Sequence, residues 1–179
     1  MGYQKFMKQS NLINGEWVHA DNRKSFNVLN PATGEIIGSV PASGYDETQK
    51  AIVAAAAAFP SYSTKPLLER VALLWKLHDA LLDNQKSLAE LLTIEQGKSL
   101  TEATGEIVIG AAYIRWFAEE IRRNKGEIVP ASAPDRRILV TRHPVGVVGM
   151  ITPWNFPSSM LARKLGPVQP AASAGPSLR

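Results

Sequence analysis

The sequence predicts an α/β fold in which small β elements come first, four helices follow, and strands then begin an incomplete, Rossmann-like parallel sheet. Three observations support this order. Short strand-like runs separated by turn residues fill positions 11–40. Helical periodicity dominates positions 46–125. The run VGVVGMI at 145–151 has no polar face, which is typical of a central strand covered by helices on both sides.

The first β elements are marked by their turns. Residues 11–18, NLINGEWV, predict a β-hairpin, because Asn14-Gly15 suits a two-residue turn in which both central residues have positive φ. Residues 25–29 and 36–40 predict two further strands. The segment NPATGE between them contains the turn dipeptides Asn-Pro and Thr-Gly.

The helices are marked by their ends and by apolar stripes. The expected helix starts are the capping pairs Asp46/Gln49, Ser87/Glu90 and Ser99/Glu102, together with Pro66. Gly97 is expected to end the helix that precedes Ser99. The second helix has a stripe made of Leu67, Val71, Leu74, His78 and Leu81, and the fourth directs Ile107, Ile114, Phe117 and Ile121 inward. Strands are expected to return at 137–142 and 145–151.

Composition excludes several classes of function. The chain of 179 residues is 45% hydrophobic and 20% charged, which is typical of a globular protein. Its net charge of +4 comes from scattered basic residues, so we expect a solvated surface and no nucleic-acid partner. The sequence contains no apolar run of the roughly 20 residues that a membrane span needs, and its start is too polar for a secretory signal. We therefore expect a cytoplasmic protein with no membrane partner.

Cysteine and histidine usage limits the chemistry further. The sequence has no cysteine, which excludes disulfides, thiolate metal sites and a cysteine nucleophile within this chain. Its three histidines are far apart in the sequence, so no metal site is expected.

The stretch ITPWNFP, residues 151–157, is the best candidate for a functional site. It follows the apolar run, and ligands of open α/β sheets bind beyond the carboxyl ends of the strands. Pro153 and Pro157 stiffen the turn around Asn155, whose side-chain amide can donate a hydrogen bond to a developing oxyanion. In the alternative interpretation Asn155 caps the next helix and its aromatic neighbours belong to the core. The residues alone favour this alternative.

Several motifs in order resemble one family. GVVGMITPWNFP is very similar to the aldehyde dehydrogenase superfamily, and so are INGEW, NPATGE, IEQGKSLTEA, GEI and WFAEE. The resemblance runs from about Leu12 to Pro167 and is strongest to the succinate-semialdehyde dehydrogenase group. It implies that residues 1–167 are the N-terminal part of the aldehyde dehydrogenase fold, containing part of the cofactor-binding domain and oligomerisation strands. Full-length members of the family are homo-oligomers.

The resemblance also implies site residues. Asn155 would be the oxyanion-hole asparagine, which donates to the substrate carbonyl oxygen when a cysteine thiolate attacks. Phe156 would line the aldehyde tunnel. The implied cofactor is NAD or NADP, and the backbone that would lie along its nicotinamide half belongs to Ile151, Thr152, Pro153 and Trp154. We do not expect this chain alone to hold that cofactor.

Arg163 indicates the substrate class. It lies eight residues after Asn155, about two helical turns, and so on roughly the same side of a helix that begins at Pro157. A guanidinium grips a carboxylate bidentately, and an arginine at this place does so in the succinate-semialdehyde group. The resemblance therefore implies a small semialdehyde substrate, with succinate semialdehyde the first choice. The sequence alone favours a surface arginine beside Lys164.

The resemblance stops after Gly166-Pro167. The family continues there with Ala-Leu-Ala-Ala-Gly-Cys, then a strand ending in Lys-Pro, a second glycine motif, a general-base glutamate and the nucleophilic cysteine. Residues 168–179 match none of these, so we expect them to form a tail outside the family pattern, irregular and exposed. One DNA sequence that encodes Ala-Ala-Gly-Cys reads VQPAA in another frame, so our hypothesis is that a frame change after Gly166-Pro167 produced residues 168–179.

Three interpretations of the whole chain follow. The first is an N-terminal portion of an NAD(P)-dependent semialdehyde dehydrogenase that is inactive by itself. The second is a non-catalytic oligomerisation module that pairs with a full-length relative through its β elements. The third is a shortened form of an intact protein. The sequence decides neither between NAD and NADP nor which semialdehyde is bound.

Overall fold

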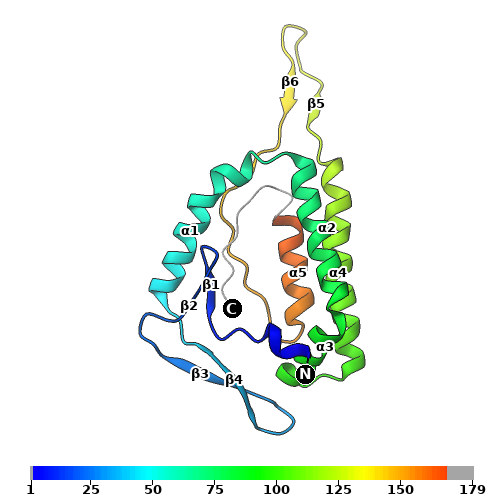
Figure 1. The fold of residues 1–179 in the computed structure, drawn as a ribbon. Coiled ribbons are helices and arrows are strands. Elements are labelled where there is room, and N and C mark those ends of the chain that lie inside the picture. Colours follow the sequence, from blue (N-terminus) through cyan, green and yellow to red (C-terminus); the bar gives the residue numbers. More distant parts are fainter. Residues whose placement is uncertain (1, 169–179) are drawn as a thin grey trace.

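A computed structural model describes residues 2–168 and confirms the α/β class (Figure 1). The α-helices are α1 (Tyr45–Ser63), α2 (Leu67–Asp83), α3 (Gln85–Gln96), α4 (Leu100–Glu120) and α5 (Pro157–Val168). Two short 3-10 helices are η1 (Gly2–Phe6) and η2 (Ile121–Arg123). The strands are β1 (Asn11–Ile13), β2 (Glu16–Val18), β3 (Ser25–Leu29), β4 (Ile36–Pro41), β5 (Glu127–Val129) and β6 (Ile138–Val140).

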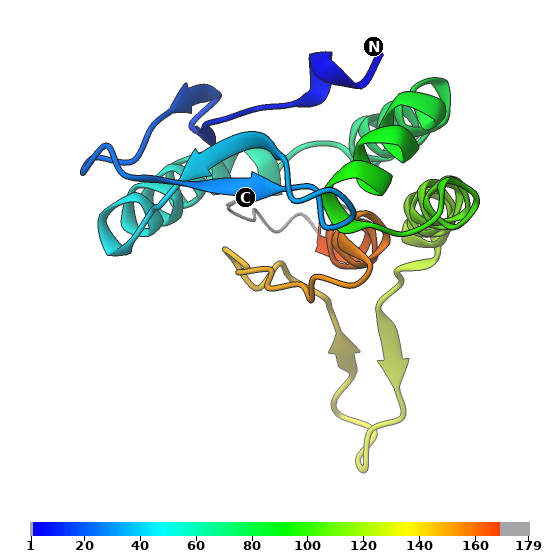
Figure 2. The same cartoon turned by 90° about the horizontal axis from the view of Figure 1, so that it is seen from below.

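The strands form three separate antiparallel pairs, β1 with β2, β3 with β4, and β5 with β6. The first pair confirms the predicted hairpin: Asn14 and Gly15 have φ of 53° and 81°, the left-handed values that its turn requires. The strand expected at 137–142 is present as β6. Figures 1 and 2 show the β5–β6 pair as an arm that projects from the rest of the molecule.

Helix α4 is the centre of the helical part, with α2, α3 and α5 packed against it. Two apolar clusters hold these helices together, and their buried members are Leu74, Ile114, Ala118 and Ala162 in one and Ala89, Leu92, Ala103 and Ile107 in the other. Two glycines lie where α4 and α5 meet, and only Gly166 is required by the close packing. A methyl group at Gly110 would lie 3.6 Å from Ala162, and one at Gly166 would lie 2.5 Å from the Phe117 ring.

Some helix ends follow the sequence prediction. Gly97 ends α3 with a φ of 83°, and Ser99 caps α4. The Ser99 hydroxyl accepts a hydrogen bond from the Glu102 N–H at 3.2 Å, and the Glu102 carboxylate accepts one from the Ser99 N–H at the same distance. This reciprocal pair is the predicted capping box.

The two other predicted capping pairs are wrong. Helix α1 begins at Tyr45, before Asp46, because the buried Glu47 carboxylate accepts hydrogen bonds from the N–H groups of Gly44 and Asp21, at 2.7 and 2.6 Å. Glu47 therefore fixes both the helix start and the preceding loop. Helix α3 begins at Gln85, so Ser87 already lies inside it. The chain turns from α2 into α3 at the single residue Asn84, which leaves no separate loop for a cap at Ser87.

The predicted strand at 145–151 is wrong for this structure. These residues are not in a strand, and the side chains of Val145 and Ile151 are each 87% exposed. A strand needs a neighbouring backbone to complete its hydrogen bonds, and the described part of the chain places none beside this segment. For the same reason residues 2–168 contain no parallel pair of strands. The predicted tail lies outside the described residues, except for Val168, which is the last residue of α5.

Candidate active site

The candidate site lies where the chain passes from the irregular segment before Asn155 into α5. Asn155 and Phe156 directly precede the helix, which begins at Pro157 as predicted. Asn155 is exposed, and within residues 2–168 its side-chain amide has no hydrogen-bond partner. The amide is therefore not used to cap α5, contrary to the alternative interpretation of the sequence. Ile151 and Trp154 are also largely exposed.

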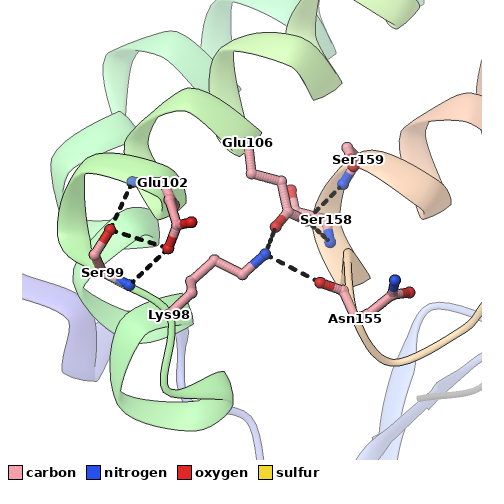
Figure 3. Close-up of polar contacts among 7 residues, drawn as sticks. All are labelled: Lys98, Ser99, Glu102, Glu106, Asn155, Ser158 and Ser159. Atoms are coloured by element: carbon pink, nitrogen blue, oxygen red, sulfur yellow. Dashed lines mark hydrogen bonds and ion pairs between the residues drawn. The ribbon is translucent and has the colours of Figure 1, made fainter.

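The start of α5 is capped by a carboxylate from another helix. Glu106 of α4 accepts hydrogen bonds through Oε1 from the N–H groups of Ser158 and Ser159, at 2.8 and 3.0 Å (Figure 3). The first N–H groups of a helix have no partner within the helix, and its dipole favours a negative charge at that end. Glu106 satisfies both requirements from a buried position, with its side chain 1% exposed.

Lys98 completes this network from the linker between α3 and α4. Its Nζ lies 2.5 Å from Glu106 Oε2 and donates a second hydrogen bond to the Asn155 carbonyl oxygen at 3.0 Å. The same ammonium lies 4.3 Å from the centroid of the Phe156 ring, a cation–π contact. Figure 3 shows Lys98 approaching the backbone of Asn155, while the side-chain amide of Asn155 points away from it.

Sequence reasoning missed Lys98 and Glu106. A signal for Glu106 was present, because it falls among the inward positions of its helix, three residues after Ala103 and four before Gly110, which are both buried. A charged residue on such a face needs a partner, since burying an unpaired charge is costly. No comparable signal identified Lys98, whose partners are distant in sequence.

Arg163 lies one helical turn before the end of α5, with its side chain against α4. Its guanidinium carbon is 5.5 Å from the centroid of the Tyr113 ring. Within residues 2–168 no carboxylate lies within ion-pair distance of Arg163. It lines a shallow groove between α5 and the 148–150 segment. The structure shows no contact between Arg163 and Asn155, because Arg163 lies six residues, about 9 Å along the axis, beyond the helix start at Pro157, and Asn155 lies before that start.

Metal-ligand clusters and membrane-spanning helices are both absent from residues 2–168. Within the described residues, no three or more histidine, aspartate or glutamate side chains are grouped so that they could hold a metal ion. None of the helices in that part of the chain is both long and apolar enough to cross a membrane.

Comparison with known proteins decides the family. The sequence profile described as "Aldehyde dehydrogenase family" matches residues 17–175. The chain belongs to the aldehyde dehydrogenase family. The resemblance found in the sequence motifs is thereby confirmed. The match runs past Pro167, where we expect the family pattern to stop, and that boundary stays a prediction.

Several curated relatives within the aldehyde dehydrogenase family are semialdehyde dehydrogenases. The chain is 49% identical over 163 residues to the glutarate-semialdehyde dehydrogenase of Pseudomonas aeruginosa, covering 91% of this chain and 34% of that protein. It is 49% identical over 172 residues to the succinate semialdehyde dehydrogenase of Acinetobacter baylyi, covering 96% and 35%. The chain thus spans about a third of the length of the curated relatives it matches.

Solved structures of aldehyde dehydrogenases contain the same fold. An Escherichia coli NADP-dependent enzyme superposes with a TM-score of 0.94 at 43% identity, over 97% of this chain and 37% of that one. A betaine aldehyde dehydrogenase from Staphylococcus aureus, solved in complex with NAD+, superposes with a TM-score of 0.92 at 29% identity, over 98% and 36%. The arrangement of helices and hairpins described above is therefore that of the N-terminal part of aldehyde dehydrogenases.

Proposed function

We propose that this chain contributes the carbonyl-binding and carboxylate-binding residues of an enzyme that oxidises a semialdehyde, with succinate semialdehyde the preferred substrate, using NAD or NADP. The observation that carries the proposal is Asn155. Its side-chain amide is exposed and unpaired within residues 2–168, although its backbone carbonyl is held by Lys98. A developing oxyanion is stabilised by hydrogen-bond donors that are already in position before the reaction.

Asn155 acts on the carbonyl oxygen of the substrate. As a nucleophile adds to the aldehyde carbon, the oxygen gains negative charge, and the Asn155 Nδ2–H donates a hydrogen bond to it. The nucleophile belongs to a part of the enzyme outside this chain, because the sequence has no cysteine. Phe156, which the Lys98 ammonium contacts through its ring, provides an apolar wall for the carbon chain of the substrate.

Arg163 acts on the far end of the substrate. Its guanidinium is exposed, held over the Tyr113 ring, and has no carboxylate partner in the described part of the chain. It is therefore available to a carboxylate of the substrate, which the guanidinium fork binds bidentately. The relatives that act on succinate and glutarate semialdehydes support a substrate with such a group.

The residues present fit the nicotinamide half of the cofactor. Ile151 and Trp154 are exposed, and residues 151–154 belong to no helix or strand, so their backbone groups are not used in helix or sheet hydrogen bonds. These residues would hold the nicotinamide end. When bound, NAD or NADP supplies the acceptor for the hydride that leaves the aldehyde carbon.

The test compares this chain with a completed enzyme. We expect the purified chain to reduce neither NAD nor NADP with succinate semialdehyde, because it lacks the nucleophile. Fusion after Gly166 to the remaining part of the Acinetobacter baylyi relative is expected to give an active enzyme. In that enzyme Asn155→Ala should lower kcat by about 10²- to 10³-fold, the usual effect of removing one oxyanion donor.

Asn124→Ala is the matched control, because it removes an exposed asparagine amide that has no hydrogen-bond partner within residues 2–168 and lies outside the site. An unchanged kcat in Asn155→Ala would contradict the proposed role. Turnover by the unfused, cysteine-free chain would contradict the proposal that it is inactive alone.

A second candidate function is a non-catalytic module that pairs with a full-length relative. The exposed apolar side chains of the hairpins favour it: Ile128 and Leu139 on β5–β6 are 79% and 68% exposed. Size-exclusion chromatography of the chain with and without the full-length relative, together with an intact-mass measurement, separates the two. A complex that changes no kinetic constant of the relative would favour this second function.

A further inference from the structure

We propose that Lys98 and Glu106 are positioning residues for Asn155: the ion pair between them fixes the start of α5, and thereby the direction in which the Asn155 amide donates. The inference rests on the proposed role of Asn155 and extends it to two residues that would not touch substrate or cofactor.

The contacts of the pair fall on four residues of the segment 155–159. Glu106 holds the N–H groups of Ser158 and Ser159. Lys98 holds the carbonyl oxygen of Asn155 and contacts the ring of Phe156. Backbone groups on both sides of Pro157 are thus tied to α4 and its linker. Lys98 binds the backbone carbonyl of Asn155 and not its side chain, so the side-chain amide remains available to donate to a substrate oxygen.

The pair itself is held rigidly. Lys98 lies between Gly97, which ends α3 in the left-handed conformation, and Ser99, whose capping box with Glu102 starts α4 (Figure 3). Glu106 lies two turns further along α4, in the helix interior. The two partners therefore approach the start of α5 from a backbone that is fixed by its own hydrogen bonds.

Stability is a poor explanation for this pair. The side chains of Lys98 and Glu106 are 10% and 1% exposed, so both charges are removed from water. The cost of removing two charges from water largely offsets their attraction, and apolar residues of similar volume often serve stability as well or better. Apolar residues could not hold the segment 155–159 in this geometry. That role needs a donor for the Asn155 carbonyl and an acceptor for the N–H groups of Ser158 and Ser159.

A double-mutant cycle in the enzyme completed by fusion after Gly166 tests the inference. Lys98→Met is expected to lower kcat by about 10- to 100-fold, since displacing a catalytic group by about 1 Å has an effect of this order. In an Asn155→Ala background the same change should lower kcat by less than about threefold, because residues that act through one group are not additive. Lys98→Arg, which keeps the charge and the donors, is expected to restore most of kcat.

Lys50→Met is the matched control, because Lys50 forms an exposed ion pair with Asp21, away from the candidate site. It should leave kcat unchanged. Equal losses from Lys98→Met in both backgrounds, or no loss in either, would overturn the inference while leaving the role of Asn155 intact. A normal kcat in Asn155→Ala would instead overturn the proposed function, and the inference with it.

Amide hydrogen exchange in the 179-residue chain gives a second readout that needs no activity. In Lys98→Met, exchange at Ser158 and Ser159 should rise by about tenfold or more, while exchange at Glu102, inside the capping box, should change little. A uniform rise across all helices would assign Lys98 to global stability and overturn the inference. If Lys98→Met does not fold, Glu106→Gln replaces it: the amide oxygen keeps an acceptor for both serine N–H groups, while the amide N–H2 in place of Oε2 cannot accept from Lys98, so the contact between residues 98 and 106 is lost.

Discussion

Replacing Arg163 by leucine in the enzyme completed after Gly166 should change substrate selectivity with little effect on folding. In the structure the guanidinium contacts the Tyr113 ring from an exposed position. An exposed cation–π contact is worth about 0.5–1 kcal/mol. The carboxylate of a bound semialdehyde would add a charge-assisted hydrogen bond of about 1.5–3 kcal/mol, which corresponds to about 10- to 100-fold in affinity.

The assay measures kcat and KM for succinate semialdehyde and for butanal, a neutral aldehyde of the same chain length. We expect Arg163→Leu to raise KM for succinate semialdehyde by about 10- to 100-fold and to leave KM for butanal nearly unchanged. Lys164→Leu is the matched control, because it removes an adjacent positive charge from the same helix without removing the guanidinium.

Two results would refute this reasoning. Equal losses on both aldehydes would mean that Arg163 supports the fold through Tyr113 and does not bind the substrate. No loss on either aldehyde would make Arg163 an ordinary surface residue. The assignment of a carboxylated substrate would then depend on the relatives alone.

Two further predictions concern the scaffold. Gly166→Ala should destabilise the chain by about 1–2 kcal/mol in urea unfolding, because the new methyl group would lie 2.5 Å from the Phe117 ring and overpacking outweighs the gain in helix propensity. Gly110→Ala, whose methyl group would meet its nearest neighbour at 3.6 Å, should be neutral or stabilising, and the reverse order would contradict the packing of α5. Hydrogen bonds from the Gly44 and Asp21 N–H groups lower the pKa of Glu47 below its ordinary value of 4.5. Its contribution to stability should therefore be complete above about pH 4.5 and be lost as pH falls through the lowered pKa, and Glu47→Gln should remove this part of the acid dependence in a pH series of thermal unfolding.

The sequence could predict features that depend on a few neighbouring residues. The Asn14-Gly15 turn, the capping box of Ser99 with Glu102 and the left-handed end at Gly97 all follow from the conformational preferences of one or two residues. Pro157 likewise marked the start of α5. The wrong assignments at Asp46 and Ser87 have a different origin. The start of α1 is set by the carboxylate of Glu47, which accepts a hydrogen bond from the Gly44 N–H. The start of α3 is set by the end of α2, which leaves only Asn84 between the two helices.

The sequence could also predict the candidate site in part. Asn155 stood out between two prolines after an apolar run, and Arg163 followed at helical spacing. Family resemblance gave both residues their expected roles. The network behind Asn155 was missed because Lys98 and Glu106 are separated from it by 57 and 49 positions, and no local pattern joins residues so far apart.

The sequence by itself therefore determined the fold class, the family, the first hairpin turn and some helix ends, all of which rest on short-range preferences and on motifs read in order. Only the tertiary structure decided which charges are buried together and whether residues 145–151 form a strand. Glu106 became the cap of α5 because helix packing brought its carboxylate to two unpaired N–H groups. The apolar run has the composition of a central strand, but a strand is completed by a neighbouring backbone, and residues 2–168 place none beside it.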